Sequence, residues 1–320
     1  MTSFDLPPEQ LPSYRGRNPR PDDHPDYWAG GLAELDPVDP EVSLVPYEHP
    51  AAGAECFDLT FTGVRGARVH AKYLRPRGGG SGRPAVLMFH GYGASSGDWF
   101  DKLPYVAQGY CVAALDCRGQ GGTSQDRGVT DGTTLGGHIV RGLEDGPGNL
   151  LYRHIFLDCV QLARIVMAMP EVDAGRVGAT GASQGGGLAV ACAALEPRVA
   201  RLAPTYPFLS DYLRVWEMDL ANEGAYEQIG TYFRRHDPLH ERAGQIFSQL
   251  GYIDVQHLAD RITAEVLFTV GLQDRVCPPS SQYAIYNKIR SGKQLRICPD
   301  FGHEPLPGQN DAVFAFMAGL

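Results

Sequence analysis

The stretch Arg176-Val-Gly-Ala-Thr-Gly-Ala-Ser-Gln-Gly-Gly-Gly187 decides the fold of this chain. It indicates a short apolar strand, a sharp turn at Ser183 and the start of a helix, with the serine at the centre of G-x-S-x-G. A serine at the tip of such a turn has strained backbone geometry, and glycines two residues to either side let the strand and the helix approach closely. The segment therefore predicts that Ser183 is a nucleophile.

The G-x-S-x-G string alone is weak evidence, because Gly93-Ala-Ser-Ser-Gly97 matches it as well. Ser95 lies six residues beyond Phe89, the end of its predicted strand, whereas Ser183 lies three residues beyond the end of its own strand and leads directly into a helix. The motif requires a strand, a turn and a helix in succession, which favours Ser183. The simpler reading is a tight turn whose hydroxyl has no chemical role.

Short apolar runs recur along the chain, spaced by helix-sized segments. Between the second and third runs, apolar residues recur at three- and four-residue steps from Leu151 to Val166, which predicts a helix. This alternation predicts an α/β protein with a mostly parallel sheet and helices on both faces. The runs are Ala85–Phe89, Tyr110–Leu115, Val177–Thr180, Val266–Val270 and Leu295–Cys298.

Two segments precede the parallel strands. Residues 57–61 and 69–73 alternate apolar and polar side chains across a turn at 63–66, which predicts an antiparallel hairpin. Residues 1–50 hold ten of the 24 prolines and show no sustained periodicity, so we expect an extended N-terminal arm over the domain surface. We treat residues 1–320 as a single domain.

Two long stretches interrupt the alternation of strands and helices. Residues 117–148 contain ten glycines and little apolar pattern, which predicts a functional rim loop. Residues 204–262 are rich in aromatic side chains and indicate an insertion between strands. We expect this insertion to cover the site and to form contacts between subunits, because aromatic residues are enriched at interfaces.

A serine hydroxyl needs a base to take its proton and an acid to orient that base, and in this fold they follow in the order Ser, Asp or Glu, His. Of the ten histidines, His303 alone follows the last two predicted strands, in the short loop 300–304. Asp274 ends the segment Gly271-Leu-Gln-Asp274, which directly follows the strand 266–270, and it stands 29 residues before His303. The sequence therefore predicts the triad Ser183, Asp274 and His303.

Other readings of these residues remain open. Asp254 and Asp260 compete for the role of the acid, although both precede the strand that the acid should follow. A solvated loop histidine and a capping aspartate are the simpler interpretations of His303 and Asp274. A metal site at His236 and His240 is disfavoured, because Pro238 interrupts the helix that their spacing requires.

The reaction also needs two backbone N–H groups that face the oxygen on which negative charge develops. In this fold the residue after the nucleophile supplies one of them, which is Gln184 here. The loop after the first parallel strand supplies the other, and the loop His90-Gly-Tyr-Gly93 stands at that place. We expect Tyr92 to be the second donor, with Gly91 as the alternative.

Composition limits the class of partner. The chain has 28 Lys+Arg against 37 Asp+Glu, and its formal net charge of −9 argues against nucleic-acid and membrane partners. The seven cysteines are scattered and include no CxxC pair, which predicts reduced thiols rather than disulfides or a zinc knuckle. The start of the sequence shows no secretory signal pattern, so we expect a cytoplasmic protein.

With these residues placed, the chain resembles the acetylxylan esterase and cephalosporin C deacetylase family, carbohydrate esterase family seven, of the α/β-hydrolase fold. Three groups of residues carry the resemblance: Arg118-Gly119-Gln120 in the rim loop, Gly181–Gly185 at the turn, and His303-Glu304 near the end. We interpret Arg118, Gly119, Gln120 and Glu304 as structural rather than catalytic, because a guanidinium beside glycines can hold a loop through several hydrogen bonds.

The resemblance implies serine-dependent removal of acetyl groups from small acetylated sugars and cephalosporins, without a metal or other cofactor. It also implies a homo-oligomer of six subunits. Bulky side chains at Tyr92 and in the segment Tyr206, Pro207 and Phe208 are candidates for a small substrate pocket. The alternatives are a broad carboxylesterase, a serine peptidase of the same fold, and a catalytically idle binding protein.

Overall fold

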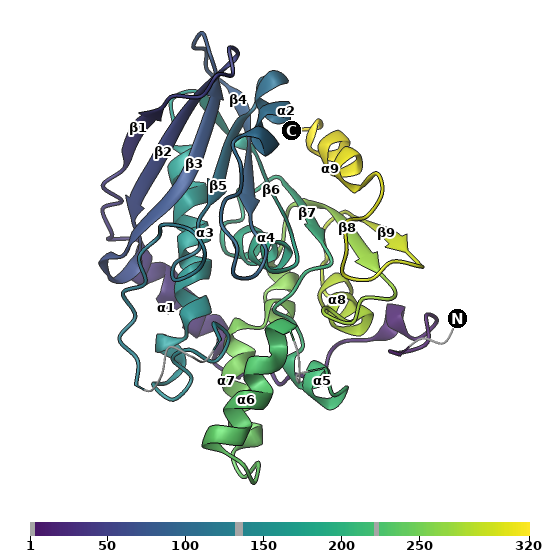
Figure 1. Cartoon of the computed structure of the whole chain (residues 1–320). Helices are drawn as coiled ribbons and strands as arrows, with labels where there is room; N and C mark the ends of the chain where they lie inside the picture. Colours follow the sequence, from purple (N-terminus) through teal and green to yellow (C-terminus); the bar gives the residue numbers. More distant parts are fainter. Residues whose placement is uncertain (1–3, 132–136, 221–223) are drawn as a thin grey trace.

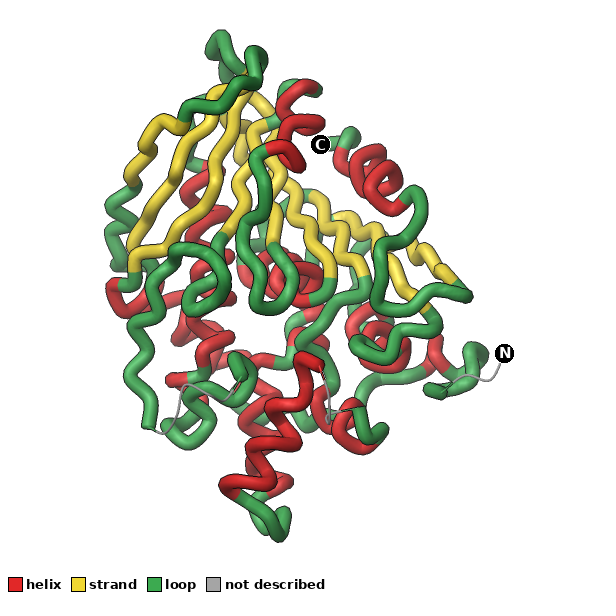
Figure 2. The backbone as a smooth tube through the Cα atoms, viewed as in Figure 1, coloured by secondary structure: helices red, strands yellow, loops and turns green. Residues whose placement is uncertain are grey.

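The computed structural model describes residues 4–131, 137–220 and 224–320. Within them nine strands form one sheet in the order β1-β2-β3-β5-β4-β6-β7-β8-β9 (Figures 1 and 2). The first three strands are antiparallel, β3 is antiparallel to β5, and all pairs from β5 to β9 are parallel. The strands are β1 (Ser43–Tyr47), β2 (Ala54–Thr62), β3 (Arg68–Pro76), β4 (Arg83–Phe89), β5 (Cys111–Leu115), β6 (Val172–Ala182), β7 (Arg201–Thr205), β8 (Glu265–Gly271) and β9 (Lys293–Cys298).

Helices cover both faces of the sheet, as the alternation of strands and helices predicts. α3 (Leu151–Met167), α4 (Gln184–Leu195) and α8 (Pro279–Tyr286) lie on one face, whereas α2 (Leu103–Ala107) and α9 (Gln309–Met317) lie on the other (Figure 1). Successive side chains of a strand point to opposite faces, so Leu87 belongs to the core under α3 and α4 while Val86 packs with Met317 of α9. The chain has the α/β-hydrolase fold.

Short 3-10 helices complete the connections. They are η1 (Leu11–Ser13), η2 (Val64–Gly66), η3 (Phe100–Lys102), η4 (Pro147–Asn149), η5 (Gly224–Tyr226), η6 (Gly251–Ile253), η7 (Val255–His257) and η8 (Ala259–Arg261). In the described ranges no helix has both the length and the apolar character that crossing a membrane requires.

The predicted hairpin and parallel strands are confirmed, and the parallel part of the sheet contains one further strand. Phe57 pairs with Tyr73 and Phe61 with Val69 in the antiparallel β2 and β3. The additional strand is β7, which pairs in parallel with β6 and β8. The sequence pattern does not indicate β7, because Pro204 interrupts a run of only five residues. The segment 204–262 therefore begins inside a strand of the sheet.

The N-terminal arm is not extended throughout, which corrects the expectation from its prolines. It contains the helix α1 (His24–Leu35) and the edge strand β1. Trp28 and Leu35 are fully buried at helical spacing, and the Trp28 ring stacks on Phe156 of α3. Pro25 stands in the first turn of α1, where a missing N–H costs nothing, so this proline is compatible with the helix.

Hydrogen bonds fasten the arm to the segment that follows β7. Tyr14 OH donates to Asp211 Oδ2 at 2.7 Å. The backbone N–H groups of Arg17 and Asn18 both donate to Asp211 Oδ1, at 2.9 and 2.8 Å. Asp211 is fully buried and has a left-handed backbone with φ of +55°. The carboxylate of Asp211 thus joins the arm to the insertion inside the protein.

In its described residues the aromatic insertion contains the α-helices α5 (Tyr212–Glu217), α6 (Glu227–His236) and α7 (Ala243–Leu250), which Figure 1 shows together below the sheet. The rings of Trp216, Phe233 and Phe247 meet at their centre, with centroids 5.5 to 5.7 Å apart. These aromatic side chains therefore form a core of the insertion itself. Parts of both predicted interruptions, 132–136 and 221–223, lie outside the described residues.

Candidate active site

Ser183 lies in the turn between β6 and the start of α4. Its φ of +57° and ψ of −123° are rare for a residue with a side chain. A Cβ at Gly185 would lie 2.0 Å from the Phe89 carbonyl oxygen, and one at Gly181 would lie 2.6 Å from the same atom. Only glycine at both positions lets β4, β6 and α4 meet here, which is the close approach that the sequence predicts.

The structure brings Ser183, His303 and Asp274 into one hydrogen-bonded chain. Ser183 Oγ lies 2.9 Å from His303 Nε2, and His303 Nδ1 lies 2.8 Å from Asp274 Oδ2. Because a carboxylate can only accept, we assign the ring proton to Nδ1, which leaves Nε2 free to accept from the serine hydroxyl. This arrangement can take a proton from Ser183 and return it.

Hydrogen bonds hold the carboxylate of Asp274 in place just after the end of β8. The carboxylate is fully buried, and its Oδ1 accepts hydrogen bonds from Val276 N at 2.9 Å and Cys277 N at 2.8 Å. Both oxygens therefore accept N–H groups, one of which belongs to the base. Such a carboxylate orients the imidazole and stabilises its protonated form.

The competing residues lie elsewhere. Asp254 caps η7 and accepts from Asp211 N, whereas Asp260 pairs with an arginine of the arm. α6 ends at His236, two residues before the proline, and the His236 and His240 rings contact different aromatic side chains. Ser95 lies in the loop after β4, where its hydroxyl accepts a long 3.5 Å hydrogen bond from Gly97 N.

Two glutamine side chains join the loop after β4 to the serine turn. The side-chain amides of Gln120 and Gln184 bond to each other at 2.9 and 3.0 Å. Gln120 Oε1 also accepts from Gly93 N at 3.0 Å, and Tyr152 OH donates to Gln184 Oε1 at 2.7 Å. The loop that carries Tyr92 therefore has a fixed position beside the start of α4.

The other signature residues also hold loops in place. Arg118 donates two hydrogen bonds to the carboxylate of Asp158 on α3, at 2.5 and 2.6 Å, and both residues are buried. Gly119 has φ of +70°, which favours glycine. Glu304 Oε1 accepts from Gly302 N at 3.1 Å and so supports the histidine loop. In this geometry the arginine fixes the rim loop to α3.

The candidate pocket residues follow β7. The Tyr206 ring lies 4.7 Å from that of His303, and its backbone has φ of +33°. Phe208 is fully buried, donates its N–H to Ser183 O at 2.9 Å and lies edge-on to the Tyr92 ring at 5.8 Å. The Cα atom of Pro207 would lie 3.1 Å from a Cβ at Gly186. The segment thus contacts both the nucleophile turn and the base.

One group of three possible metal ligands occurs in the described residues, and it coincides with the triad. One ligand atom each from Asp274, Cys277 and His303 lie within 4.8 Å of one another. Burial raises the pKa of the Cys277 thiol well above its usual range, so the sulfur is protonated rather than the thiolate that a metal prefers. Both Asp274 oxygens already accept N–H groups. The group is therefore better suited to proton transfer than to metal coordination.

Sequence reasoning misses several polar residues near the site. Tyr152 and Asp158 lie on one helix and hold Gln184 and Arg118, but the helix pattern shows only the apolar residues between them. Asp116 directly follows β5, two residues before Arg118, and its Oδ2 lies 2.7 Å from His70 Nδ1 of β3. A carboxylate just after a buried strand is a usable signal, whereas its pairing with His70 depends on strand order.

Comparison of this sequence with models of known protein families identifies its family. The sequence model of acetyl xylan esterase (AXE1) matches residues 1–320, the whole chain. The chain belongs to the acetyl xylan esterase family.

The closely similar structures are also members of this family by name. An acetyl xylan esterase from Thermoanaerobacterium sp. is 56% identical, with a TM-score of 0.97 and 99% of each chain covered. An acetyl xylan esterase from Paenibacillus sp. is 32% identical, with a TM-score of 0.94, and 98% of this chain and 99% of that chain are covered. An acetyl esterase of Xylanibacter ruminicola is 26% identical over 298 residues. This match covers 91% of the present chain, which spans 65% of that protein's length.

In this family member, Gly185→Ala is expected to lower the free energy of unfolding by about 2 kcal/mol or more, because the added Cβ meets backbone atoms that cannot move aside. Gly244→Ala is the matched control. Gly244 lies in α7 with open space around it, so alanine there should raise stability by up to about 1 kcal/mol. Urea unfolding of both variants checks this. Equal stability of Gly185→Ala and the unchanged protein would contradict it.

Proposed function

We propose that this chain is a serine esterase that removes acetyl groups from small acetylated substrates, xylo-oligosaccharides and cephalosporin C-like compounds, through an acetyl-enzyme on Ser183. The observation that carries the proposal is the hydrogen-bonded chain from Ser183 through His303 to Asp274 in a member of the acetyl xylan esterase family. The names of its relatives support acetyl as the group removed.

In the first step, Ser183 Oγ attacks the carbonyl carbon of the ester while its proton passes to His303 Nε2, 2.9 Å away. The buried carboxylate of Asp274 stabilises the imidazolium that forms. Negative charge develops on the carbonyl oxygen, where the backbone N–H groups of Tyr92 and Gln184 donate. Each such donor contributes about 3 kcal/mol to stabilisation of the transition state.

The tetrahedral intermediate then breaks the bond between the carbonyl carbon and the oxygen of the sugar. His303 donates its Nε2 proton to this leaving oxygen, and the acetyl group remains on Ser183 Oγ. Water attacks the same carbonyl carbon while His303 takes one of its protons. A second collapse returns this proton to Ser183 Oγ and releases acetic acid, which ionises in solution.

Acetyl preference is the part of the proposal that rests on the pocket residues. Tyr206, Pro207 and Phe208 contact the serine turn and the base, and the Tyr92 ring is held by hydrogen bonds from Gln228 Nε2 and His138 N to its hydroxyl oxygen. We expect these bulky side chains, fixed from two sides, to restrict the acyl pocket to a small group. A buried aromatic such as Phe208 cannot move aside without loss of packing.

Ser183→Ala is expected to lower kcat for an acetyl ester by about a thousandfold or more with the fold intact, because it removes the attacking oxygen. Ser95→Ala is the matched control, since it makes the same change in the other G-x-S-x-G match, and it should keep at least a third of the activity. Hydrolysis of 4-nitrophenyl acetate measures both. More than about a tenth of the activity left in Ser183→Ala would refute the assignment.

Chain length of the acyl group gives a second test. We expect kcat/KM to fall steeply from acetyl to butyryl and octanoyl esters of one alcohol, because each methylene that the pocket excludes costs about 1 to 3 kcal/mol. Matched acetamides distinguish the peptidase alternative and should react far more slowly. Equal kcat/KM for acetate and octanoate esters would argue for a broad carboxylesterase instead.

We also propose a closed homo-oligomer of six subunits, to which the exposed apolar residues of the edge strand and the arm contribute. Val45 and Tyr47 of β1, the outermost strand of the described sheet, and Val42 just before it are more than 40% exposed. Sedimentation equilibrium should give six times the mass of one chain, and short acetylated oligosaccharides should react faster per acetyl group than polymeric xylan. A monomer at micromolar concentration would exclude this assembly.

A further inference from the structure

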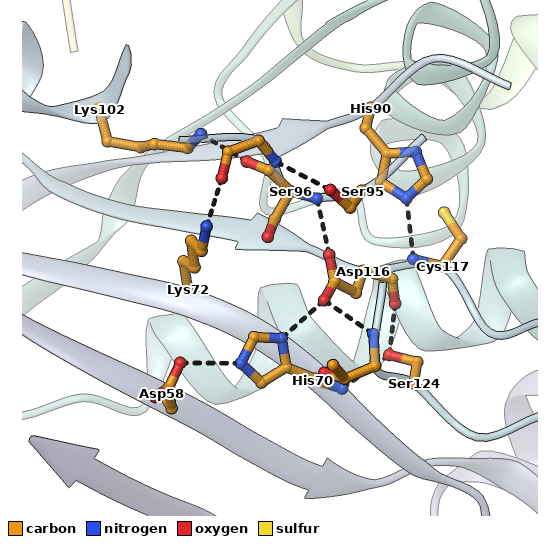
Figure 3. A network of polar contacts seen from close by, with 12 residues as sticks. Asp58, His70, Lys72, His90, Ser95, Ser96, Lys102, Asp116, Cys117 and Ser124 are labelled. Carbon is orange, nitrogen blue, oxygen red and sulfur yellow. Dashed lines mark hydrogen bonds and ion pairs between the residues drawn. The ribbon is translucent and has the colours of Figure 1, made fainter. Parts of the chain in front are cut away.

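A second histidine lies between two carboxylates outside the triad. His70 Nδ1 lies 2.7 Å from Asp116 Oδ2, and His70 Nε2 lies 3.1 Å from Asp58 Oδ1 (Figure 3). Burial alone would lower the pKa of His70, but the hydrogen bonds to Asp116 and Asp58 outweigh burial and raise it. Because both carboxylates accept, both ring nitrogens donate, and the ring carries a positive charge.

Asp116 connects this histidine to the loop after β4. Its Oδ1 accepts from Ser96 N at 2.6 Å, and the next residue, Cys117, donates its N–H to His90 Nε2 at 3.0 Å (Figure 3). Two adjacent residues at the end of β5 therefore hold both ends of residues 90–96. We call residues 90–96 the oxyanion loop, because Tyr92 lies within it.

Further contacts hold the middle and the far end of the oxyanion loop. Gly121 N donates to Ala94 O at 3.0 Å. Lys102 Nζ donates to Ser96 O, and the Lys102 side chain is only 4% exposed. The carboxylate of Asp116 thus accepts from the N–H of Ser96, while the ammonium of Lys102 donates to the Ser96 carbonyl oxygen. Buried charged side chains therefore hold both the backbone N–H and the carbonyl oxygen of Ser96.

We propose that His70 and Asp116 are positioning residues for ester hydrolysis, which fix the oxyanion loop so that Tyr92 N–H meets the oxyanion of the intermediate. This inference rests on the proposed esterase function. Asp116 is only 3% exposed, and without His70 its Oδ2 would keep one contact, from Thr123 N at 3.2 Å. A buried carboxylate without its counter-charge is costly, so it would rotate or draw in water, and Ser96 would move with it.

The two carboxylates beside His70 provide a matched test. Asp116→Asn and Asp58→Asn make the same chemical change on opposite sides of one ring, but only Asp116 touches the oxyanion loop. Asp58 lies on β2, and its side chain is 42% exposed. We expect Asp116→Asn to lower kcat for an acetyl ester about tenfold or more with KM within threefold, because misplacement of a catalytic group by about 1 Å costs up to a hundredfold. Asp58→Asn should stay within twofold of the unchanged protein.

Two substitutions of His70 test whether a hydrogen-bond donor to Asp116 is enough to preserve activity. The side-chain nitrogen of asparagine lies close to where His70 has Nδ1, so His70→Asn keeps a donor to Asp116 but does not reach Asp58. His70→Ala removes both contacts. We expect His70→Ala to lose tenfold or more in kcat and His70→Asn to stay within about fivefold. Where His70→Ala does not fold, the pair Asp116→Asn and Asp58→Asn decides the question.

Labelling of Ser183 by a fluorophosphonate separates positioning from simple loss of folded protein, because the labelled serine carries an oxygen that the same N–H groups stabilise. Positioning predicts full labelling amplitude in Asp116→Asn, with a rate constant reduced by the same factor as kcat/KM. A reduced amplitude at an unchanged rate, or equal damage in Asp58→Asn, would overturn the inference. If the unchanged protein labels but does not hydrolyse acetyl esters, the proposed function fails, and the labelling rates still judge the role of His70 and Asp116.

Discussion

The backbone contact between the end of β4 and the start of α4 constrains the rest of the site. The Phe89 carbonyl oxygen occupies the space that a side chain at position 181 or 185 would need, so no side chain separates the two elements. Ser183 and the loop that carries Tyr92 follow two adjacent strands, β6 and β4. The carboxyl ends of parallel strands meet at one edge of the sheet, which brings Asp274 after β8 and His303 after β9 to the same place.

Buried charges surround this contact, and each has a counter-charge. Arg118 faces Asp158, and Asp116 faces His70, in surroundings with little access to solvent. A buried ion pair adds little net stability compared with apolar packing, but the loss of one partner is costly. These pairs therefore restrict the loops to one arrangement more than they stabilise the fold. Apolar packing of α3 and α4 against the sheet supplies the stability.

Sequence alone predicts those features that depend on local pattern or on chain order. Ser183 follows from glycine spacing, and Asp274 and His303 follow from the position of each residue after its strand. The sequence does not predict β7, because Pro204 breaks a short run. It does not predict α1 either, because prolines surround that helix, although Trp28 and Leu35 have helical spacing. The pairing of His70 with Asp116 depends on β3 lying next to β5, an order that no spacing in the sequence reveals.

The hydrogen bonds between the arm and Asp211 have a consequence for the order of folding. Tyr14 and Asn18 are synthesised well before their partner Asp211, which lies 193 to 197 residues later in the chain. Asn18 also donates to Phe247 O, 229 residues away. This early part of the chain can therefore dock only after most of the sheet has been synthesised. Until then the arm exposes Trp28, so a slow ribosome lengthens the period in which this apolar surface is open to other chains.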